Sequence, residues 1–195
     1  MSVPCPRCGR GYDVALFQFG RTIHCTCGSR VGLEPRIRPV SSGHELRFMA
    51  DAMLGRLARW LRILGCDVTF EPEIPDAELV RRALEEERVI LTRDRALPEE
   101  WRLPQVLIVE SDAPLLQLQQ VVRGFELDWR ARLFTRCSRC NTELETVAHE
   151  DVATRVPPRI FSEQERFLRC ASCERIYWGG SHSERMRRVL DEALG

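Results

Sequence analysis

Apolar residues in the middle of the chain follow two different periods. Short continuous apolar runs, typical of buried strands, alternate with stretches in which apolar side chains recur at helical spacing. The expected strands span residues 46–50, 66–70, 89–91 and 106–109. The expected helices span residues 52–64, 76–87 and 115–122. This alternation predicts an α/β fold with a parallel sheet covered on both faces.

Aspartates stand where the expected strands end. Asp51, Asp94 and Asp112 each follow a strand, and Asp76 begins a helix. Because function in such sheets lies outside the carboxyl ends of the strands, we expect these four carboxylates to meet at one edge. Carboxylates brought together repel one another unless a divalent cation binds them, and oxygen ligands favour Mg²⁺ or Mn²⁺ over Zn²⁺. The alternative for each aspartate is a cap on the helix or turn that follows it.

Charge is unevenly distributed although the formal net charge is zero. Residues 1–50 hold 7 arginines and 3 acidic residues, residues 51–129 hold 10 and 16, and residues 130–195 hold 12 and 10. An acidic middle suits a hard cation, and basic flanks suit a polyanion. Ordinary variation of a protein surface is the alternative.

The two ends of the chain are rich in cysteine and differ from the middle. Pro35, Pro39 and Gly43 lie in a stretch that is typical of a linker. The expected domains are an N-terminal zinc ribbon (1–34), a linker (35–44), an α/β core (45–132) and a C-terminal zinc ribbon with a terminal helix (133–195).

The first ribbon contains one set of four cysteines with the spacing of metal ligands. These are Cys5, Cys8, Cys25 and Cys27. His24 offers a substitute ligand, but four thiolates are favoured because a glycine follows both Cys8 and Cys27. Residues 12–19 and 21–23 are expected to form the small hairpin of this ribbon.

The second ribbon contains two Cys-x-x-Cys pairs, which are a strong zinc signature. The pairs are Cys137 with Cys140 and Cys170 with Cys173. The residues between them include Pro157 and Pro158 and are expected to form a loop. Four protein ligands close the coordination sphere of each zinc, so both zinc ions are expected to be structural. The ninth cysteine, Cys66, is expected to be a small buried core residue.

The beginning of the sequence and its hydropathy predict a cytoplasmic protein. No charged segment followed by an apolar stretch opens the chain, and no apolar run approaches the roughly 18 residues that cross a membrane. Thiols stay reduced in the cytoplasm, which favours metal binding over disulfides for the paired cysteines.

Several motifs together resemble the Mut-seven C-terminal ribonuclease family, a PIN-like group, from about residue 46 to 190. The motifs are FMADAMLGRLARWLRILG (48–65), RVILTRDRAL (88–97), RCSRCN (136–141) with the second cysteine pair, and YWGGSH (177–182). The resemblance implies a PIN-like core with an appended zinc ribbon. It also implies a metal-dependent ribonuclease that uses one or two Mg²⁺ or Mn²⁺ ions.

The resemblance also implies roles for particular residues. Asp51, Asp94 and Asp76 are the expected metal ligands, and Asp112 is a fourth expected catalytic carboxylate. Glu78 is an alternative to Asp76, because it lies on the same helical turn. In such nucleases the metal activates a water and stabilises charge on the phosphate that is cut.

Arginines and aromatic residues supply the expected RNA contacts. Arg56, Arg59 and Arg62 recur at every third position after Asp51, and Arg93 precedes Asp94. Phosphate binding and a solvated helix face are both open for the three helix arginines, and phosphate contact or pairing with an acid is open for Arg93. The three remaining candidates are Tyr177, Trp178 and His182. The two aromatic residues suit either base stacking or packing of the ribbon, and His182 suits either RNA contact or a structural hydrogen bond.

The leading hypothesis is therefore a metal-dependent ribonuclease whose zinc ribbons bind RNA. A non-catalytic RNA- or ribosome-binding protein is the main alternative. A protein-binding or toxin-like role and a DNA nuclease stay open, and the sequence leaves the oligomeric state undetermined.

Overall fold

The computed structural model describes residues 2–33, 46–101, 103 and 105–195, the side chain of residue 19 excepted. The expected linker at 35–44 lies outside the described residues. The chain divides into two compact units, which are described separately here. Unit 1 comprises Met1–Gly55 and Thr69–Glu110, and unit 2 comprises Arg56–Val68 and Ser111–Gly195. No helix among the described residues is long and apolar enough to cross a membrane.

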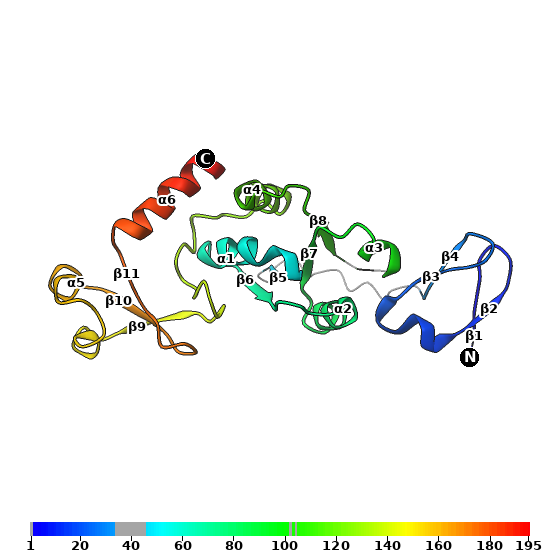
Figure 1. Cartoon of the computed structure of the whole chain (residues 1–195), viewed down its shortest axis with the longest axis horizontal. Helices are drawn as coiled ribbons and strands as arrows, with labels where there is room; N and C mark the ends of the chain where they lie inside the picture. The colour runs from blue at the N-terminus through cyan, green and yellow to red at the C-terminus, as the bar shows by residue number, and fades with distance from the viewer. Residues whose placement is uncertain (1, 34–45, 102, 104) are drawn as a thin grey trace. The chain divides into compact units, whose positions relative to one another are not determined.

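A four-stranded sheet has the strand order β6-β5-β7-β8 (Figure 1). Its strands are β5 (Arg47–Ala50), β6 (Asp67–Phe70), β7 (Val89–Thr92) and β8 (Val106–Ile108). β5 pairs with β7 and β7 with β8, both in parallel. All four residues of β7 are buried, as expected for a central strand with covered faces. The α/β fold with a parallel sheet is thus confirmed, and the four expected strands are present.

Short helices follow the strands of unit 1. They are the 3₁₀-helix η2 (Ala52–Leu54), α2 (Asp76–Glu85) and α3 (Leu97–Glu100). α2 packs against β5 and β7. Leu79, Val80 and Ala83 recur at helical spacing on α2 and join Met49 and Ile90 of the sheet in one buried cluster. This cluster holds the carboxyl ends of β5 and β7 in place.

The N-terminal ribbon consists of two small antiparallel hairpins and a 3₁₀-helix. Its elements are β1 (Ser2–Pro4), β2 (Gly11–Asp13), η1 (Val14–Gly20), β3 (Ile23–His24) and β4 (Arg30–Val31). β1 pairs with β2 and β3 with β4. The expected hairpin of residues 12–19 with 21–23 is therefore wrong, because Asp13 caps η1 through the amide of Ala15 and most of that segment is helical.

Unit 2 contains the helix α1 (Gly55–Ile63, from Arg56 onward), α4 (Pro114–Gly124) and α6 (Ser181–Leu194). α4 packs against α6. Leu118 of α4 and Leu190 of α6 are fully buried. The helices expected at 52–64 and 115–122 are thus present, the first with a 3₁₀ turn at its beginning.

The C-terminal ribbon contains a three-stranded antiparallel sheet of order β11-β10-β9 (Figure 1). Its elements are β9 (Leu144–Val147), the 3₁₀-helix η3 (Glu150–Val152), α5 (Pro158–Glu163), β10 (Phe167–Cys170) and β11 (Ile176–Trp178). The prediction of a loop between the two cysteine pairs is wrong, because this segment contains strands and short helices. Pro158 is the first residue of α5, where a missing N–H costs nothing, and Val152, Val156 and Phe167 form a small core.

Candidate functional site

Asp51 lies directly after β5, and hydrogen bonds hold both its backbone and its carboxylate. Its backbone N–H donates to the carbonyl of Leu91 at 3.0 Å, which continues the pairing of β5 with β7. One carboxylate oxygen accepts the amide of Ala52 at 2.5 Å and so caps η2. The other accepts the hydroxyl of Thr92 at 2.5 Å. Asp51 therefore does cap the helix that follows it, as the alternative expected, but the cap uses only one of its two carboxylate oxygens.

Thr92 links Asp51 to the segment that carries Asp94. The Thr92 side chain is fully buried at the end of β7. Its hydroxyl oxygen accepts the backbone N–H of Asp94 at 2.9 Å while its proton goes to Asp51. A carboxylate oxygen of Asp94 in turn accepts the amide of Ala96 at 2.8 Å. The sequence did not single out Thr92 as a site residue. Its place at the end of an expected strand, two residues before Asp94, was a signal that could have identified it.

Asp76 is the exposed first residue of α2. The helix has Pro75 at its N-cap position and no side-chain cap, so capping does not account for Asp76. The pKa of Asp76 is raised by partial burial and by the negative charges of Asp51, Asp94 and Glu100. Asp76 therefore lies close enough to Asp51 and Asp94 to feel their negative charge. Glu100, at the end of α3, is a carboxylate that the sequence reasoning did not include.

No salt bridge to Asp51, Asp76 or Asp94 occurs within the described ranges, so no arginine neutralises them there. Their oxygens are not drawn together into one tight group. In the described part of the chain, only the two sets of four cysteines bring three or more candidate ligand atoms within 4.8 Å of one another. The three carboxylates therefore have no cationic partner among the described residues, and their oxygens are the donor type that Mg²⁺ and Mn²⁺ prefer.

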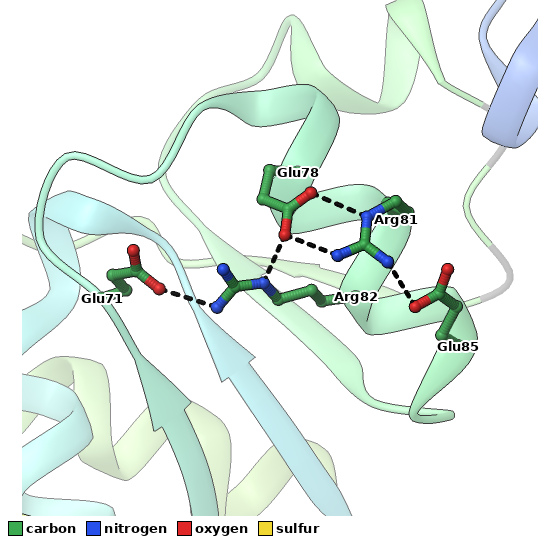
Figure 2. Close-up of polar contacts among 5 residues, drawn as sticks. All are labelled: Glu71, Glu78, Arg81, Arg82 and Glu85. Atoms are coloured by element: carbon green, nitrogen blue, oxygen red, sulfur yellow. Dashed lines mark hydrogen bonds and ion pairs between the residues drawn. The ribbon is translucent and has the colours of Figure 1, made fainter.

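Glu78 is committed to arginines of its own helix. Figure 2 shows its carboxylate between Arg81 and Arg82, with contacts of 2.6 Å and 2.5 Å. Arg81 also contacts Glu85, and Arg82 also contacts Glu71. The hydrogen bonds from Arg81 and Arg82 lower the pKa of Glu78 to about 2. A carboxylate with two guanidinium partners is a poor competitor for a metal, so Asp76 is the better candidate on this turn.

Asp112 belongs to unit 2, whereas Asp51, Asp76 and Asp94 belong to unit 1. It is exposed and precedes α4, whose N-cap position is occupied by Ala113. Asp112 is therefore not the N-cap that the alternative expected. Its role as a fourth catalytic carboxylate stays a prediction.

The arginines expected to contact RNA differ in exposure. Arg56 and Arg59 are exposed on α1, and Arg93 is half-buried next to Asp94. Arg62 is 7% exposed, and its guanidinium donates to the carbonyls of Val68 and Arg139. Arg62 therefore fits neither alternative: it does not lie on a solvated helix face, and its donors bind backbone carbonyls instead of a phosphate.

The aromatic candidates of unit 2 also separate. The Tyr177 hydroxyl lies 3.1 Å from the Cys137 sulfur, so Tyr177 serves the cysteine site. Trp178 is 37% exposed and meets Phe167 edge-on at 6.4 Å. His182 is exposed in the first turn of α6. Trp178 and His182 are thus accessible, and their contact with RNA stays a prediction.

Both cysteine sets have the geometry of a tetrahedral zinc site. The Sγ atoms of Cys8 and Cys25 are 3.5 Å apart, and those of Cys137 and Cys173 are 3.8 Å apart. Thiolates about 2.3 Å from a tetrahedral zinc lie roughly 3.8 Å from one another, so the donors fit this metal. His24 is exposed and is not part of the first set, which leaves four thiolates as the ligands.

All four half-sites share one backbone turn. The residue after the second cysteine has a positive φ in each, and its amide donates to the carbonyl of the first cysteine. These residues are Gly9 (φ 73°), Gly28 (φ 82°), Asn141 (φ 68°) and Glu174 (φ 59°). The Cys25–Cys27 turn is one residue shorter than the three Cys-x-x-Cys turns, but it closes with the same amide-to-carbonyl hydrogen bond and the same positive φ.

Comparison with protein families gives one match that covers most of the chain. The model of the Mut7-C RNAse domain matches residues 46–190. Comparison with the curated proteins and with the solved structures gives no match. The matched range contains Asp51, Asp76, Asp94 and the second set of cysteines, whereas the N-terminal ribbon lies outside it.

Proposed function

Because the chain belongs to the Mut7-C RNAse domain family, we propose that it is a metal-dependent ribonuclease with its acidic site at the ends of β5 and β7. The observation that carries the proposal is the hydroxyl of Thr92, which binds the carboxylate of Asp51 and the backbone of Asp94. The same edge of the sheet thus orients two carboxylates from neighbouring parallel strands. The fold around them is proposed to be PIN-like.

The proposed metal ligands are Asp51, Asp94 and Asp76. Mg²⁺ or Mn²⁺ bound there would supply an activated water and would stabilise negative charge on the phosphate. The protein's own contribution is orientation. Thr92 and the amide of Ala52 fix the carboxylate of Asp51, and the amide of Ala96 fixes that of Asp94. Partial burial and the negative charges of Asp51, Asp94 and Glu100 raise the pKa of Asp76, which supports cation binding at this edge.

RNA is the proposed substrate, and arginines are the proposed phosphate contacts. Arg56, Arg59 and Arg93 are the candidates, together with His182. Arginine binds phosphate oxygens bidentately, so each contact adds affinity that weakens with salt. Both zinc sites are proposed to be structural, because each offers four thiolates and therefore no open position for a substrate.

The test replaces single aspartates and measures cleavage. Zinc-loaded protein is incubated with single-stranded and hairpin RNAs in Mn²⁺ or Mg²⁺, and products are resolved by length. Asp94→Asn keeps the volume and the acceptor for Ala96 but removes the charge, so we expect cleavage to fall by about 100-fold or more. Asp151→Asn is the matched control, because Asp151 is an exposed aspartate of η3 far along the chain. Equal product patterns for wild type and Asp94→Asn would refute the enzymatic proposal.

One observation favours a second candidate, a non-catalytic RNA-binding protein. The carboxylate oxygens at the ends of β5 and β7 do not converge as tightly as the two cysteine sets. This candidate predicts salt-sensitive RNA binding that is unchanged in Asp51→Asn and Asp94→Asn, without cleavage in any metal. The same incubation, combined with a filter-binding series in salt, separates the two candidates.

A further inference from the structure

The N-terminal ribbon contacts the carbonyl end of the short helix α3 within unit 1. Thr22 is 5% exposed, although it is polar and lies in a small ribbon. Its hydroxyl donates to the carbonyls of Glu99 at 2.6 Å and Glu100 at 2.9 Å. Its backbone N–H also donates to the carbonyl of Glu100. Thr22 therefore satisfies the last two carbonyls of α3.

Arg30 completes this cap from the neighbouring strand of the ribbon. Its guanidinium donates to the carbonyl of Pro98 at 2.6 Å and to that of Trp101 at 3.3 Å. It also donates to the hydroxyl oxygen of Thr22 at 3.0 Å, which orients that hydroxyl toward α3. The guanidinium of Arg21 lies 5.8 Å from the centre of the Trp101 ring. Four successive carbonyls, from residue 98 to residue 101, thus have a partner in the ribbon.

Such a cap matters because α3 has four residues. A helix this short is not stable alone, and its terminal carbonyls have no partner within the helix. A cation at the carbonyl end also interacts favourably with the helix dipole. The ribbon thus supplies both hydrogen bonds and charge at the end where α3 needs them.

α3 is joined directly to the acidic site at its other end. Ala96, which precedes α3, accepts the amides of Glu99 and Glu100 and donates its own amide to the carboxylate of Asp94. Asp94 is in turn tied to β7 through Thr92. The segment that carries Asp94 is therefore fixed by the sheet on one side and by the ribbon-capped helix on the other.

The first cysteine set holds the capping residues in place. β3 pairs with β4 with His24 opposite Arg30, and the turn between the strands contains Cys25 and Cys27. Thr22 precedes β3, and Arg30 begins β4. Zinc at this turn would therefore fix the separation of Thr22 and Arg30. η1 of the same ribbon also packs against α2, the helix that begins with Asp76.

We infer that the N-terminal ribbon is a positioning element of the acidic site: by capping α3 through Thr22 and Arg30 it orders the segment that carries Asp94. The inference rests on the proposed function for its consequence in catalysis, and it assigns the ribbon a task within the nuclease. An RNA-binding module joined by a free tether would leave this segment unaffected.

The experiment compares Thr22→Val with Thr22→Ser in the full zinc-loaded chain. Valine keeps the shape and burial of Thr22 but loses both the donor and the acceptor, whereas serine keeps the hydroxyl. Zinc content is measured first, so that a ribbon that has lost its metal is recognised. The experiment has two readouts. The first is amide hydrogen exchange of residues 94–101. The second is binding of Mn²⁺, measured from the electron paramagnetic resonance signal of free Mn²⁺. Neither requires cleavage of RNA.

We expect exchange in residues 94–101 to rise about 10-fold in Thr22→Val, since a lost buried hydrogen bond of about 1.4 kcal/mol corresponds to this factor. Binding of Mn²⁺ weakens by a similar factor, and Thr22→Ser restores both to within about twofold of wild type. Exchange in the C-terminal ribbon stays unchanged in both variants and serves as the internal control.

Two results would overturn the inference. Unchanged exchange of residues 94–101 in a zinc-loaded Thr22→Val protein would show that the ribbon does not order this segment. Faster exchange with unchanged Mn²⁺ binding would show that the ribbon caps α3 without positioning Asp94. A wild type that binds Mn²⁺ but cuts no RNA would instead refute the proposed ribonuclease, and the exchange and binding data would still decide the inference.

Discussion

Arg62 offers a stability test within unit 2. Its Nε donates to the carbonyl of Val68 at 2.9 Å and its Nη1 to the carbonyl of Arg139 at 2.8 Å. It thereby joins α1 and the beginning of β6 to the knuckle of Cys137 and Cys140. Burial lowers the pKa of the guanidinium, and thiolate charge on the two cysteines opposes this effect. Arg62 is thus a structural cation next to a metal site.

The perturbation is Arg62→Met, which keeps the apolar stem and removes the donors. The buried carbonyl of Val68 then loses its partner at about 1.5 kcal/mol, and the partly buried carbonyl of Arg139 at about 0.5 kcal/mol, so we expect a loss of about 2 kcal/mol in the free energy of unfolding. Arg62→Lys should lie between this variant and wild type, because one ammonium group cannot reach both carbonyls with the fork geometry of a guanidinium. Arg59→Met, on the exposed side of the same helix, should change stability by no more than about 0.5 kcal/mol.

The assay is urea unfolding of the zinc-loaded protein by circular dichroism, with zinc release followed by a colorimetric indicator. The indicator separates unfolding of the cysteine site from loss of helix, because two compact units need not unfold together. Equal midpoints for Arg62→Met and Arg59→Met would refute the reasoning, since the buried hydrogen bonds would then contribute nothing measurable. If Arg62→Met bound RNA more weakly without any loss of stability, the result would instead indicate that Arg62 binds phosphate.

Two further predictions concern single residues of unit 2. Burial raises the pKa of Cys66 to about 11, so its thiolate fraction at pH 8 is about one in a thousand. In zinc-loaded protein a thiol reagent should therefore modify Cys66 about 100-fold more slowly than a free cysteine at pH 8, and the rate should increase as the pH rises. Mass spectrometry of the peptide that contains Cys66 measures this rate. Rapid labelling of Cys66 at pH 8 would contradict the prediction. Asn141 has a φ of 68°, accepts the amide of Val68 and donates to the carboxylate of Asp67. Asn141→Ala should be about 1 kcal/mol less stable than Asn141→Gly in urea unfolding, because only glycine adopts this φ without strain. Both variants lose the side-chain contacts, so equal stability would show that the positive φ costs nothing at this position.

The sheet and its acidic edge were predictable because both follow from local patterns. Continuous apolar runs such as residues 89–91 indicate buried strands whatever surrounds them, and Asp51 and Asp94 follow such runs directly. The four turns of the cysteine sites were predictable for the same reason, since the ligands lie two or three residues apart. The sequence pattern alone could not exclude Glu78 as a metal ligand, because its ion pairs depend on the side-chain positions of Arg81 and Arg82.

The helical spacing of the arginines on α1 shows why periodicity failed at one position. Three residues advance an α-helix by about 300°, so each step of three turns the side chain back by about 60°. Arg62 therefore lies about 120° around the helix from Arg56, although both belong to one apparent row. A segment about 75 residues away, at Arg139, decides which of these arginines is buried, and local sequence carries no record of it.

Four buried polar side chains in the described part of the chain extend this argument. They are Thr22, Arg62, Thr92 and Gln117. Thr22 and Arg62 bind carbonyls 76 to 78 positions away, and Thr92 binds a carboxylate 41 positions away. Burying a polar group is costly unless it finds a partner, so a long-range partner helps to stabilise Thr22, Arg62 and Thr92. Gln117 differs, because its side chain donates to the carbonyl of Ser111, six positions away. The aspartates at the strand ends could be predicted because they follow local apolar runs. The contacts of Thr22 with Glu99 and Glu100 join segments 77 and 78 positions apart, so the part that we infer for the N-terminal ribbon could not be predicted from local sequence.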